Sequence, residues 1–524
     1  MVTLVSAADA RDCVMGDGEA AFLDVREAGQ FGEAHALLAT PLPYSELEIR
    51  VRAMVPRLST PCVVIDAGDG ISPRAAARLE GLGYSDVRIL DGGMPAWKED
   101  GFTVYKGVNV PSKVFGELVE HDFHTESIGA EELHAMQARG EDLVVLDGRT
   151  PEEFNRMSIP QGISCPNAEL GLRLEALLPS KDSLVVVNCA GRTRSIMGAQ
   201  SLVELGVSNR VVALRNGTMG WRLAGYELES ESPKTFPSEL SQAQLQLGRD
   251  RGEALCAKHK LRRVDAQTVK SWFMDHERTV SLLDVRTAKE FYEHHLAGAQ
   301  HAPGGQLVQA TDQWVAVRGA RIVLADSHLV RAAISAVWMR AMGHEVYIMD
   351  DLTDWPRDDV DLPGFDGTPE FDRVPCLGTD ALEHALSKGA VIADIRASAT
   401  YRKGHPSGAI WTIRPNLLDD LHGRSNVILL SDQDSIASLA ARDLSDAGFE
   451  VVGAISNDSD VWAAAGVPSE KSPQSPPDSE RIDYLFFVHD RHAGNMEAAQ
   501  AYLDWETGLV DQLDDQERAI FASL

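Results

Sequence analysis

One cysteine in this chain stands in a setting that could activate its thiol. Cys189 lies in the stretch Asn-Cys-Ala-Gly-Arg-Thr-Arg-Ser-Ile, residues 188–196, and two arginines, Arg192 and Arg194, follow it closely. The thiolate is the nucleophilic form of cysteine, and nearby cations and amide donors lower the pKa of the thiol. These residue types therefore predict a nucleophilic cysteine in a turn that binds an anion.

Two elements must position this turn. An apolar run at 184–187 precedes it and predicts a buried strand, while apolar residues at Ile196, Ala199 and Leu202 predict a helix after it. Where a parallel strand turns into a helix, backbone N–H groups and the positive end of the helix dipole point at one place. Cys189 occupies that place, so we expect a lowered pKa and favour a functional cysteine over a buried structural one.

The same pattern occurs four times along the chain. A short apolar run ends in Asp-x-Arg at Asp24, Asp147, Asp284 and Asp394. Downstream turns place Asp66, Cys189, Asp326 and Ser431 at equivalent positions, and each copy closes on a tryptophan, namely Trp97, Trp221, Trp355 and Trp462. The turn follows the aspartate by 42 residues in the first three copies and by 37 in the fourth. Three landmarks kept in step predict four homologous copies. Each copy is longer than a solenoid repeat of about 20 to 50 residues, so we expect each to be a separate domain.

Each copy is expected to be an α/β domain, a parallel sheet flanked by helices. The predicted domains are residues 1–107, 124–232, 259–365 and 373–466. Boundaries are expected where the pattern lapses, which it does at about 108–123, at about 238–260 and in a Pro/Gly/Asp segment near 362–370. A Pro/Ser-rich linker at 466–480 leads to an acidic C-terminal helical appendage at 481–524.

Composition argues against several classes of partner. The chain of 524 residues carries 79 Asp+Glu against 49 Lys+Arg, which disfavours nucleic acid or an anionic membrane surface as a partner. The six cysteines include no CxxC pair, so we expect neither a disulfide framework nor a metal site, and no cofactor is predicted. No apolar stretch reaches the ~18 residues of a membrane span, and the start lacks the basic region of a secretory signal. We therefore expect a soluble, cytoplasmic protein.

The Asp-x-Arg strands, the Cys-x4-Arg turn and the Gly-Gly-x3-Trp ending of the first copy resemble rhodanese domains, and residues 1–466 resemble a multidomain rhodanese-type sulfurtransferase. The resemblance implies that Cys189 carries sulfur as a persulfide, formed by attack on a sulfane donor such as thiosulfate. It also implies a cradle for the anionic donor and the persulfide, made of Ala190, Gly191, Arg192, Thr193, Arg194 and Ser195. Arg149 and Glu153 are expected to form a structural salt bridge. We call residues 189–195 the nucleophile turn.

The other three copies are expected to be catalytically silent. Neither the carboxylates of Asp66 and Asp326 nor the hydroxyl of Ser431 can form a persulfide. An aspartate in such a turn can instead accept hydrogen bonds from the N–H groups that would otherwise bind an anion. We therefore expect the two aspartates to be structural.

A few further residues have weaker claims. Cys165 could resolve the persulfide into a disulfide, but a structural strand-end cysteine is the favoured interpretation. Arg173 could contact substrate or form a surface salt bridge. His489 and His492 have helical spacing that suits a metal, yet without a third ligand polar surface is favoured. The aromatic residues of the appendage are expected to pack it onto a domain or a second subunit; they are Tyr484, Phe486, Phe487, Tyr502 and Trp505.

Two classes of function remain. The first is an enzyme that moves sulfane sulfur from thiosulfate or a similar anion, through Cys189, to a thiophilic acceptor: cyanide in vitro, a thiol or a protein in the cell. The second is a scaffold or persulfide relay whose silent domains bind partner proteins. The nucleophile turn favours the first, and its four residues between Cys189 and Arg194 fit phosphatase or arsenate reductase chemistry less well. A homodimer is left open.

Overall fold

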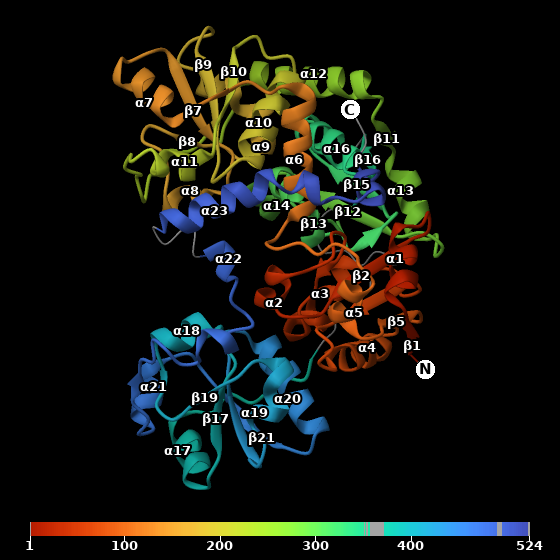
Figure 1. The fold of residues 1–524 in the computed structure, drawn as a ribbon, viewed down its shortest axis with the longest axis vertical. Helices are drawn as coiled ribbons and strands as arrows, with labels where there is room; N and C mark the ends of the chain where they lie inside the picture. The colour runs from red at the N-terminus through yellow and green to blue at the C-terminus, as the bar shows by residue number, and fades with distance from the viewer. Residues whose placement is uncertain (1, 351, 353–354, 357–370, 490–494, 522–524) are drawn as a thin grey trace.

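Four open sheets with helices on their faces follow one another along the chain in the computed structural model (Figure 1). The structure describes residues 2–350, 352, 355–356, 371–489 and 495–521. The predicted end of the third domain and the Pro/Gly/Asp segment near 362–370 lie outside the described residues. The second and third domains lie together at one end of the molecule, the fourth lies at the other end, and the first lies between them (Figure 1).

The second domain shows the common plan. Its strands are all parallel, in the order β6-β10-β9-β7-β8. They are β6 (Ser127–Ile128), β7 (Leu143–Asp147), β8 (Ile163–Ser164), β9 (Leu184–Asn188) and β10 (Val211–Leu214). The helices are α7 (Ala130–Ala138), α8 (Pro151–Arg156), α9 (Asn167–Leu177), α10 (Thr193–Glu204) and α11 (Gly217–Leu223). The valines and leucines of β7 and β9 are largely buried because helices cover both faces, which confirms the predicted fold class.

The first and third domains repeat this plan. The first contains β1 (Thr3–Val5), β2 (Ala20–Asp24), β3 (Thr40–Pro41), β4 (Cys62–Ile65), β5 (Val87–Leu90), α1 (Ala7–Met15), α2 (Ala28–Glu33), α3 (Leu47–Met54), α4 (Ile71–Gly81) and α5 (Gly93–Glu99). The third contains β11 (Arg262–Val264), β12 (Val280–Asp284), β13 (Gln300–His301), β15 (Arg321–Ala325), β16 (Glu345–Met349), α13 (Ala266–Phe273), α14 (Ala288–Glu293), α15 (Gly304–Gln309) and α16 (Val330–Ala341). A further strand, β14 (Val317–Arg318), pairs antiparallel with β2 and so joins the two domains.

The fourth domain has the strand order β19-β17-β20-β21. Its elements are β17 (Val391–Asp394), β19 (Ile410–Trp411), β20 (Asn426–Leu430), β21 (Glu450–Ile455), α17 (Thr379–Ser387), α18 (Ser398–Lys403), α19 (Leu417–Asp420), α20 (Asp434–Asp446) and α21 (Ser459–Ala464). A two-stranded ladder of β18 (His405–Pro406) and β22 (Ser469–Glu470) lies beside it. The predicted linker at 466–480 therefore begins as part of this domain.

Two stretches expected to be lapses in the pattern are helices. The first, α6 (Val110–Phe123), crosses α10 closely, since a Cβ on Gly116 would lie only 2.8 Å from Thr193 Cγ2. The second, α12 (Gln242–His259), packs against α9 and α16 and joins the second and third domains. Its buried face consists of Gly248, Gly252, Leu255 and Cys256, so two glycines interrupt the apolar stripe. A hydrophobic period could not reveal such a helix.

Buried ion pairs hold the domains to one another. Arg331 of the third domain donates to Glu169 of the second at 3.0 Å, and the arginine is fully buried. Arg414 of the fourth domain donates to Glu48 of the first at 2.6 and 2.7 Å, and also to Asp443 at 2.8 Å. A buried ion pair thus ties the third domain to the second, and another ties the fourth domain to the first.

The C-terminal appendage returns from the fourth domain, past the first, to the second (Figure 1). Its helices are α22 (Phe486–His489), α23 (Met496–Thr507) and α24 (Asp515–Arg518). The amide of Gly29 donates to the carbonyl of Ile482 at 2.7 Å, and Met219 of α11 packs against Tyr502 and Leu503 of α23. The predicted packing of the appendage onto the domains is confirmed. Within the described residues, no helix has both the length and the apolar character needed to cross a membrane.

Candidate active site

The nucleophile turn joins β9 to α10 as the sequence predicts. Cys189 is 2% exposed, and its Sγ lies 3.6 Å from the hydroxyl of Ser195. In the described part of the chain, no acceptor takes the amide N–H groups of residues 190–194. These amides precede and open α10, where the helix dipole also favours negative charge. The turn is therefore suited to hold an anion next to the thiol.

The Asp-x-Arg segment is hydrogen-bonded to the residue that precedes the nucleophile turn. Asp147, at the end of β7, accepts hydrogen bonds from Nε and Nη2 of Arg149, both at 2.8 Å. It also accepts one at 2.6 Å from the side chain of Asn188, the residue before Cys189. Because Asp147 and Arg149 are almost fully buried, this network fixes the strand end that carries the cysteine.

Glu153 pairs with the turn and not with Arg149. Arg194 donates to its two carboxylate oxygens at 2.6 and 2.8 Å. The predicted salt bridge between Arg149 and Glu153 is wrong, because Arg149 folds back onto Asp147 while Glu153, in the first turn of α8, faces Arg194. Burial acts to raise the pKa of the Glu153 carboxyl, but the Arg194 guanidinium lowers it to about 2. Glu153 is thus a fixed negative charge.

Arg192 also has carboxylate partners. Its Nε and Nη2 donate to Glu117 of α6 at 2.8 Å each, and it pairs with Glu120 as well. The helix that the sequence pattern did not reveal therefore anchors one of the two cradle arginines. Neither arginine of the turn contributes an uncompensated positive charge.

The thiol of Cys189 does not have the lowered pKa that the sequence predicts. Burial raises the pKa above its ordinary value, the Arg194 guanidinium and the Ser195 hydroxyl act to lower it, and the Glu506 carboxylate adds to the rise. The difference has a physical cause: each nearby arginine is already paired, and a carboxylate from the C-terminal appendage lies close by. Both conditions depend on residues outside the turn.

A cavity of about 280 Å³ opens beside Cys189. Besides the nucleophile turn, five other stretches of the chain line it. They include Glu153 of α8, Lys113 of α6, Gln306 and Gln309 of α15, His489 of α22, and Tyr502 and Glu506 of α23. The hydroxyl of Thr193 donates to Glu506 Oε1 at 2.7 Å. The site is therefore completed by the third domain and the appendage.

The sequence analysis missed Glu506, although one signal was present. In α23 the buried residues Ala499, Tyr502, Leu503 and Glu506 recur at helical spacing, so the glutamate lies on the face that packs against the molecule. An ionisable residue on a buried helix face needs a partner or a function.

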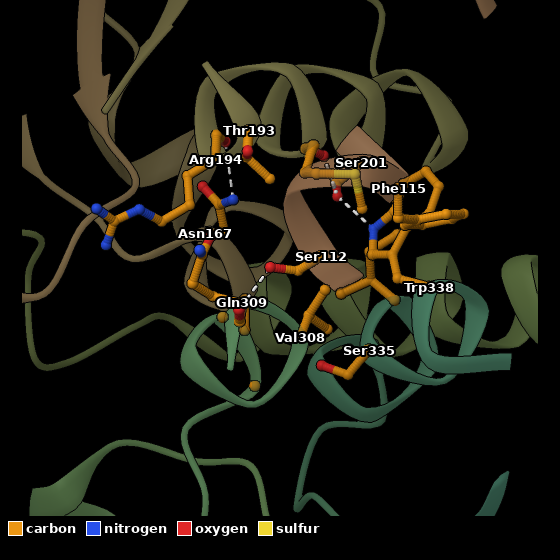
Figure 2. Close-up of a pocket in the computed structure, with 15 residues that line it drawn as sticks. Ser112, Phe115, Asn167, Thr193, Arg194, Ser201, Val308, Gln309, Ser335 and Trp338 are labelled. Atoms are coloured by element: carbon orange, nitrogen blue, oxygen red, sulfur yellow. Dashed lines mark hydrogen bonds between the residues drawn. The ribbon is translucent and has the colours of Figure 1, made fainter. Parts of the chain in front are cut away.

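A much smaller cavity, about 20 Å³, lies behind the nucleophile turn, where α6, α10, α15 and α16 meet (Figure 2). The side chain of Asn167 donates to the backbone carbonyl of Arg194 at 2.9 Å, and Trp338 donates to Ser201 at 2.9 Å. Figure 2 shows the Arg194 side chain pointing away from this cavity. The cavity thus belongs to the domain interface that positions the start of α10.

Two candidates are placed away from the site. Cys165 is fully buried in the core with Leu146 and Leu170, burial raises its pKa well above the usual value, and it does not line the cavity. Arg173 is 5% exposed and donates to Glu169 at 3.0 Å and to the carbonyl of Pro237 at 2.9 Å. Both positions fit structural roles.

The histidine pair suggested for a metal can be followed only in part. His489 lies in the wall of the cavity, whereas His492 lies outside the described residues. Among the residues that the structure describes, no group of three or more His, Cys, Asp or Glu side chains could hold a metal ion.

In the first domain an aspartate fills the amide-lined turn. Asp66 accepts hydrogen bonds from the N–H groups of Gly68 and Ser72 at 2.9 and 2.8 Å. The carboxylate takes the kind of donors that the second domain leaves for an anion, as predicted. Ser431 of the fourth domain accepts from the amide of Gln433 at 3.2 Å in the corresponding turn.

The third domain keeps more of the site but not its thiol. Asp326 accepts from the amide of Arg331 at 2.9 Å and from its side chain at 2.8 Å. Arg331 also pairs with Glu290, in the same way that Arg194 pairs with Glu153. The ion pair is therefore part of the shared framework, while the thiol is specific to the second domain.

Tandem parallel-sheet domains define a multidomain α/β protein, and among the four equivalent turns a cysteine stands only in that of the second domain. The Rhodanese-like domain model matches residues 7–100, 129–224 and 265–355, more than half of the chain, so the chain belongs to the rhodanese family. The fourth domain is not among the matched segments, although its central strands keep the same neighbour relations.

Relatives agree with this assignment. The crystal structure of thiosulfate sulfurtransferase from Pseudomonas aeruginosa is 40% identical, with a TM-score of 0.90, and the match covers 100% of this chain and 99% of that one. "Putative thiosulfate sulfurtransferase SseB" of Mycobacterium tuberculosis is 34% identical over 116 residues, 22% of this chain; the chain spans only 40% of SseB. A sulfurtransferase of Allochromatium vinosum is 32% identical over 98 residues, 19% of this chain and 89% of that protein.

Proposed function

We propose that this protein is a sulfurtransferase that carries sulfane sulfur on Cys189. The observation that carries the proposal is the nucleophile turn, which combines a thiol with amide N–H groups that have no acceptor in the described chain. Relatives named thiosulfate sulfurtransferase and sulfurtransferase support this class of reaction. The equivalent positions of the other three domains carry no sulfur atom.

In the first half of the reaction, the Cys189 thiolate attacks the sulfane sulfur of thiosulfate. The new Sγ–S bond forms, the S–S bond of thiosulfate breaks, and sulfite leaves with the electron pair. The amides of residues 190–194 stabilise the negative charge of the donor and of the persulfide. Because thiosulfate is a dianion, it also needs positive charge in the cavity.

That charge has a source outside the turn. Lys113 and Arg156 line the cavity, and neither forms an ion pair with a carboxylate within the described residues. Lys113 lies over the rings of Tyr502 and Trp505, at 5.5 and 5.7 Å. These two cations are better placed to attract an anionic donor than Arg192 and Arg194, which are already paired.

In the second half, a thiophilic acceptor takes the sulfur: a thiol or protein in the cell, cyanide in the test tube. Residues of α15 and α23 form part of the cavity wall, so an acceptor that reaches Cys189 must fit beside them. The scaffold alternative finds less support, because ion pairs such as Arg414 with Glu48 use surfaces of the silent domains within the chain. Cytoplasmic location and the homodimer stay predictions.

The proposal predicts a persulfide on one cysteine. Incubation with thiosulfate should add about 32 Da to the Cys189 peptide, the mass of one sulfur atom, as measured by mass spectrometry. Cys189→Ser should abolish thiocyanate formation from thiosulfate and cyanide, because a serine hydroxyl is not ionised near neutral pH and cannot carry sulfane sulfur. Cys376→Ser, at an exposed cysteine, is the matched control and should keep its activity. Full turnover in folded Cys189→Ser protein would refute the proposal.

A further inference from the structure

We propose that Glu506, on the C-terminal helix α23, is the proton acceptor for a thiol that receives sulfur from Cys189. This inference rests on the proposed function, since it concerns the second half of the same reaction. It assigns a catalytic role to a segment whose sequence suggested only packing.

Two contacts fix the position of the Glu506 carboxylate: the packing of helix α23 and a hydrogen bond of the side chain. Tyr502 and Leu503 of α23 pack against Met219 of α11, which holds the helix onto the second domain. At the end of the side chain, Glu506 Oε1 accepts the hydroxyl hydrogen bond of Thr193. Glu506 is 2% exposed. The carboxylate therefore reaches the nucleophile turn and is held there.

The second carboxylate oxygen of Glu506, Oε2, accepts no hydrogen bond within the described residues. Glu506 Oε2 is also buried. It lies 3.1 Å from the point where a Cβ on Gly191 would be, so it faces the turn directly. A buried carboxylate oxygen without a donor is costly, and such a group at a cavity wall indicates a ligand that brings the donor. A thiol S–H is a donor of this kind.

The other carboxylate in the cavity wall cannot do this work. Both oxygens of Glu153 accept from Arg194, and although burial opposes it, the arginine lowers the pKa of Glu153 to about 2. His489 also lines the cavity and is the side chain tested below as a competing proton acceptor. His489 lies on the short helix α22, whereas Glu506 is hydrogen-bonded to Thr193 of the nucleophile turn.

The proton balance of the step is closed by these groups. The anionic persulfide left by the first half-reaction takes up one proton from solvent and becomes Cys189–S–SH. The acceptor R–SH then gives its proton to Glu506, and R–S⁻ attacks the outer sulfur of Cys189–S–SH. A new S–S bond joins the acceptor sulfur to the outer sulfur and gives R–S–SH. The S–S bond to Cys189 breaks, and Cys189 leaves as a thiolate. Glu506 then returns the proton to that thiolate, whose pKa burial keeps above the usual value. The net change is the transfer of one sulfur atom without oxidation or reduction of the pair.

The test isolates the second half-reaction. Cys189 is loaded with thiosulfate, the donor is removed, and loss of the ~32 Da increment is followed after mixing with 2-mercaptoethanol or with sulfite. Sulfite is the matched acceptor because it is already an anion near neutral pH. In Glu506→Gln, we expect unloading by the thiol to slow about 10²-fold, and unloading by sulfite to stay unchanged or become faster, because a like charge is lost. The glutamine keeps an oxygen for Thr193.

A pH profile separates catalysis from mere positioning. The thiol rate of Glu506→Gln should climb with pH as the thiol ionises, and approach that of the parent at alkaline pH. Glu497→Gln, at an exposed glutamate of the same helix, should behave like the parent protein. Equal slowing with thiol and sulfite, no slowing with the thiol, or a loss found in His489→Gln instead would each overturn the role of Glu506. Failure to load the parent Cys189 would refute the proposed function itself.

Discussion

At the scale of single residues, the charges around Cys189 come in matched pairs. Arg194 pairs with Glu153, and Arg192 pairs with Glu117, so the thiol does not face a free arginine. Burial then raises its pKa, and only the remaining influence of Arg194 and Ser195 acts to lower it. The amides of the turn, rather than the arginines, are the uncommitted donors for an anion.

This balance predicts opposite shifts in two variants. Arg194→Ala removes the cation that favours the thiolate, so the pKa of Cys189 should rise further and alkylation by iodoacetamide at a given pH should slow. Glu506→Gln removes a like charge, so the pKa should fall and alkylation should quicken. The measurement is the rate of alkylation of Cys189 as a function of pH.

Arg210→Ala serves as the control, because Arg210 pairs with Glu126 on the exposed surface of the same domain. Its profile should match that of the parent. Identical profiles in all three variants would show that the charges of Arg194 and Glu506 do not reach the thiol. Arg194→Ala should also lower stability, because it leaves Glu153 without its partner.

At the scale of elements, one strand–turn–helix unit is used with different residues at its centre. Cys189 leaves the amides of its turn open, whereas Asp66 and Asp326 accept from the amides of theirs. An aspartate that accepts N–H groups at a helix start stabilises the helix in the manner of a cap. In the first and third domains, the aspartate thus occupies amides of the kind that the second domain leaves open.

Asp66→Ala should therefore destabilise the protein while leaving catalysis intact. The loss of two amide hydrogen bonds at the head of α4 should cost about 0.5–2 kcal/mol, seen as a lower midpoint of thermal or urea unfolding. Thiocyanate formation should be unchanged, because Asp66 is remote from the cavity beside Cys189. Asp12→Ala, at an exposed residue of α1, is the control for a lost carboxylate. Equal stability of the two variants would contradict the capping role.

At the scale of the whole molecule, the site is assembled from separate parts of the chain. The second domain supplies the thiol, α15 of the third domain supplies Gln306 and Gln309, and α23 supplies Glu506. The third domain is in turn fixed to the first by the pairing of β14 with β2. The third domain therefore contributes part of the cavity wall, and the first domain helps to hold the third in place.

The link between the first and fourth domains can be tested separately. Glu48→Gln removes the charge that faces the buried guanidinium of Arg414. The free energy of unfolding should therefore fall by about 1–3 kcal/mol, while activity at Cys189 is retained. Glu46→Gln changes an exposed i,i+4 pair with Arg50 and should have little effect. Thermal unfolding with limited proteolysis of the fourth domain gives the readout. Equal midpoints for the two variants would show that the buried pair adds no stability.

The sequence by itself determined the features that near neighbours encode. The four Asp-x-Arg strands, the Cys-x4-Arg turn and the aspartates at equivalent positions are local patterns. They gave the fold class, and they predict Cys189 as the nucleophile and three domains without one. Helices α6 and α12 were not predicted from the pattern. Gly248 and Gly252 interrupt the apolar residues on the buried face of α12, and the buried face of α6 includes the polar Ser112 and Lys113 beside its apolar residues.

Only the tertiary structure decided the electrostatics of the site. Glu506 lies 313 residues along the chain from Thr193, its hydrogen-bond partner, and Glu117 lies 75 residues from Arg192. No local pattern states which charges will meet at such separations. Burial itself, which raises the pKa of Cys189, is likewise a property of the packed molecule, because desolvation depends on every segment that covers the thiol.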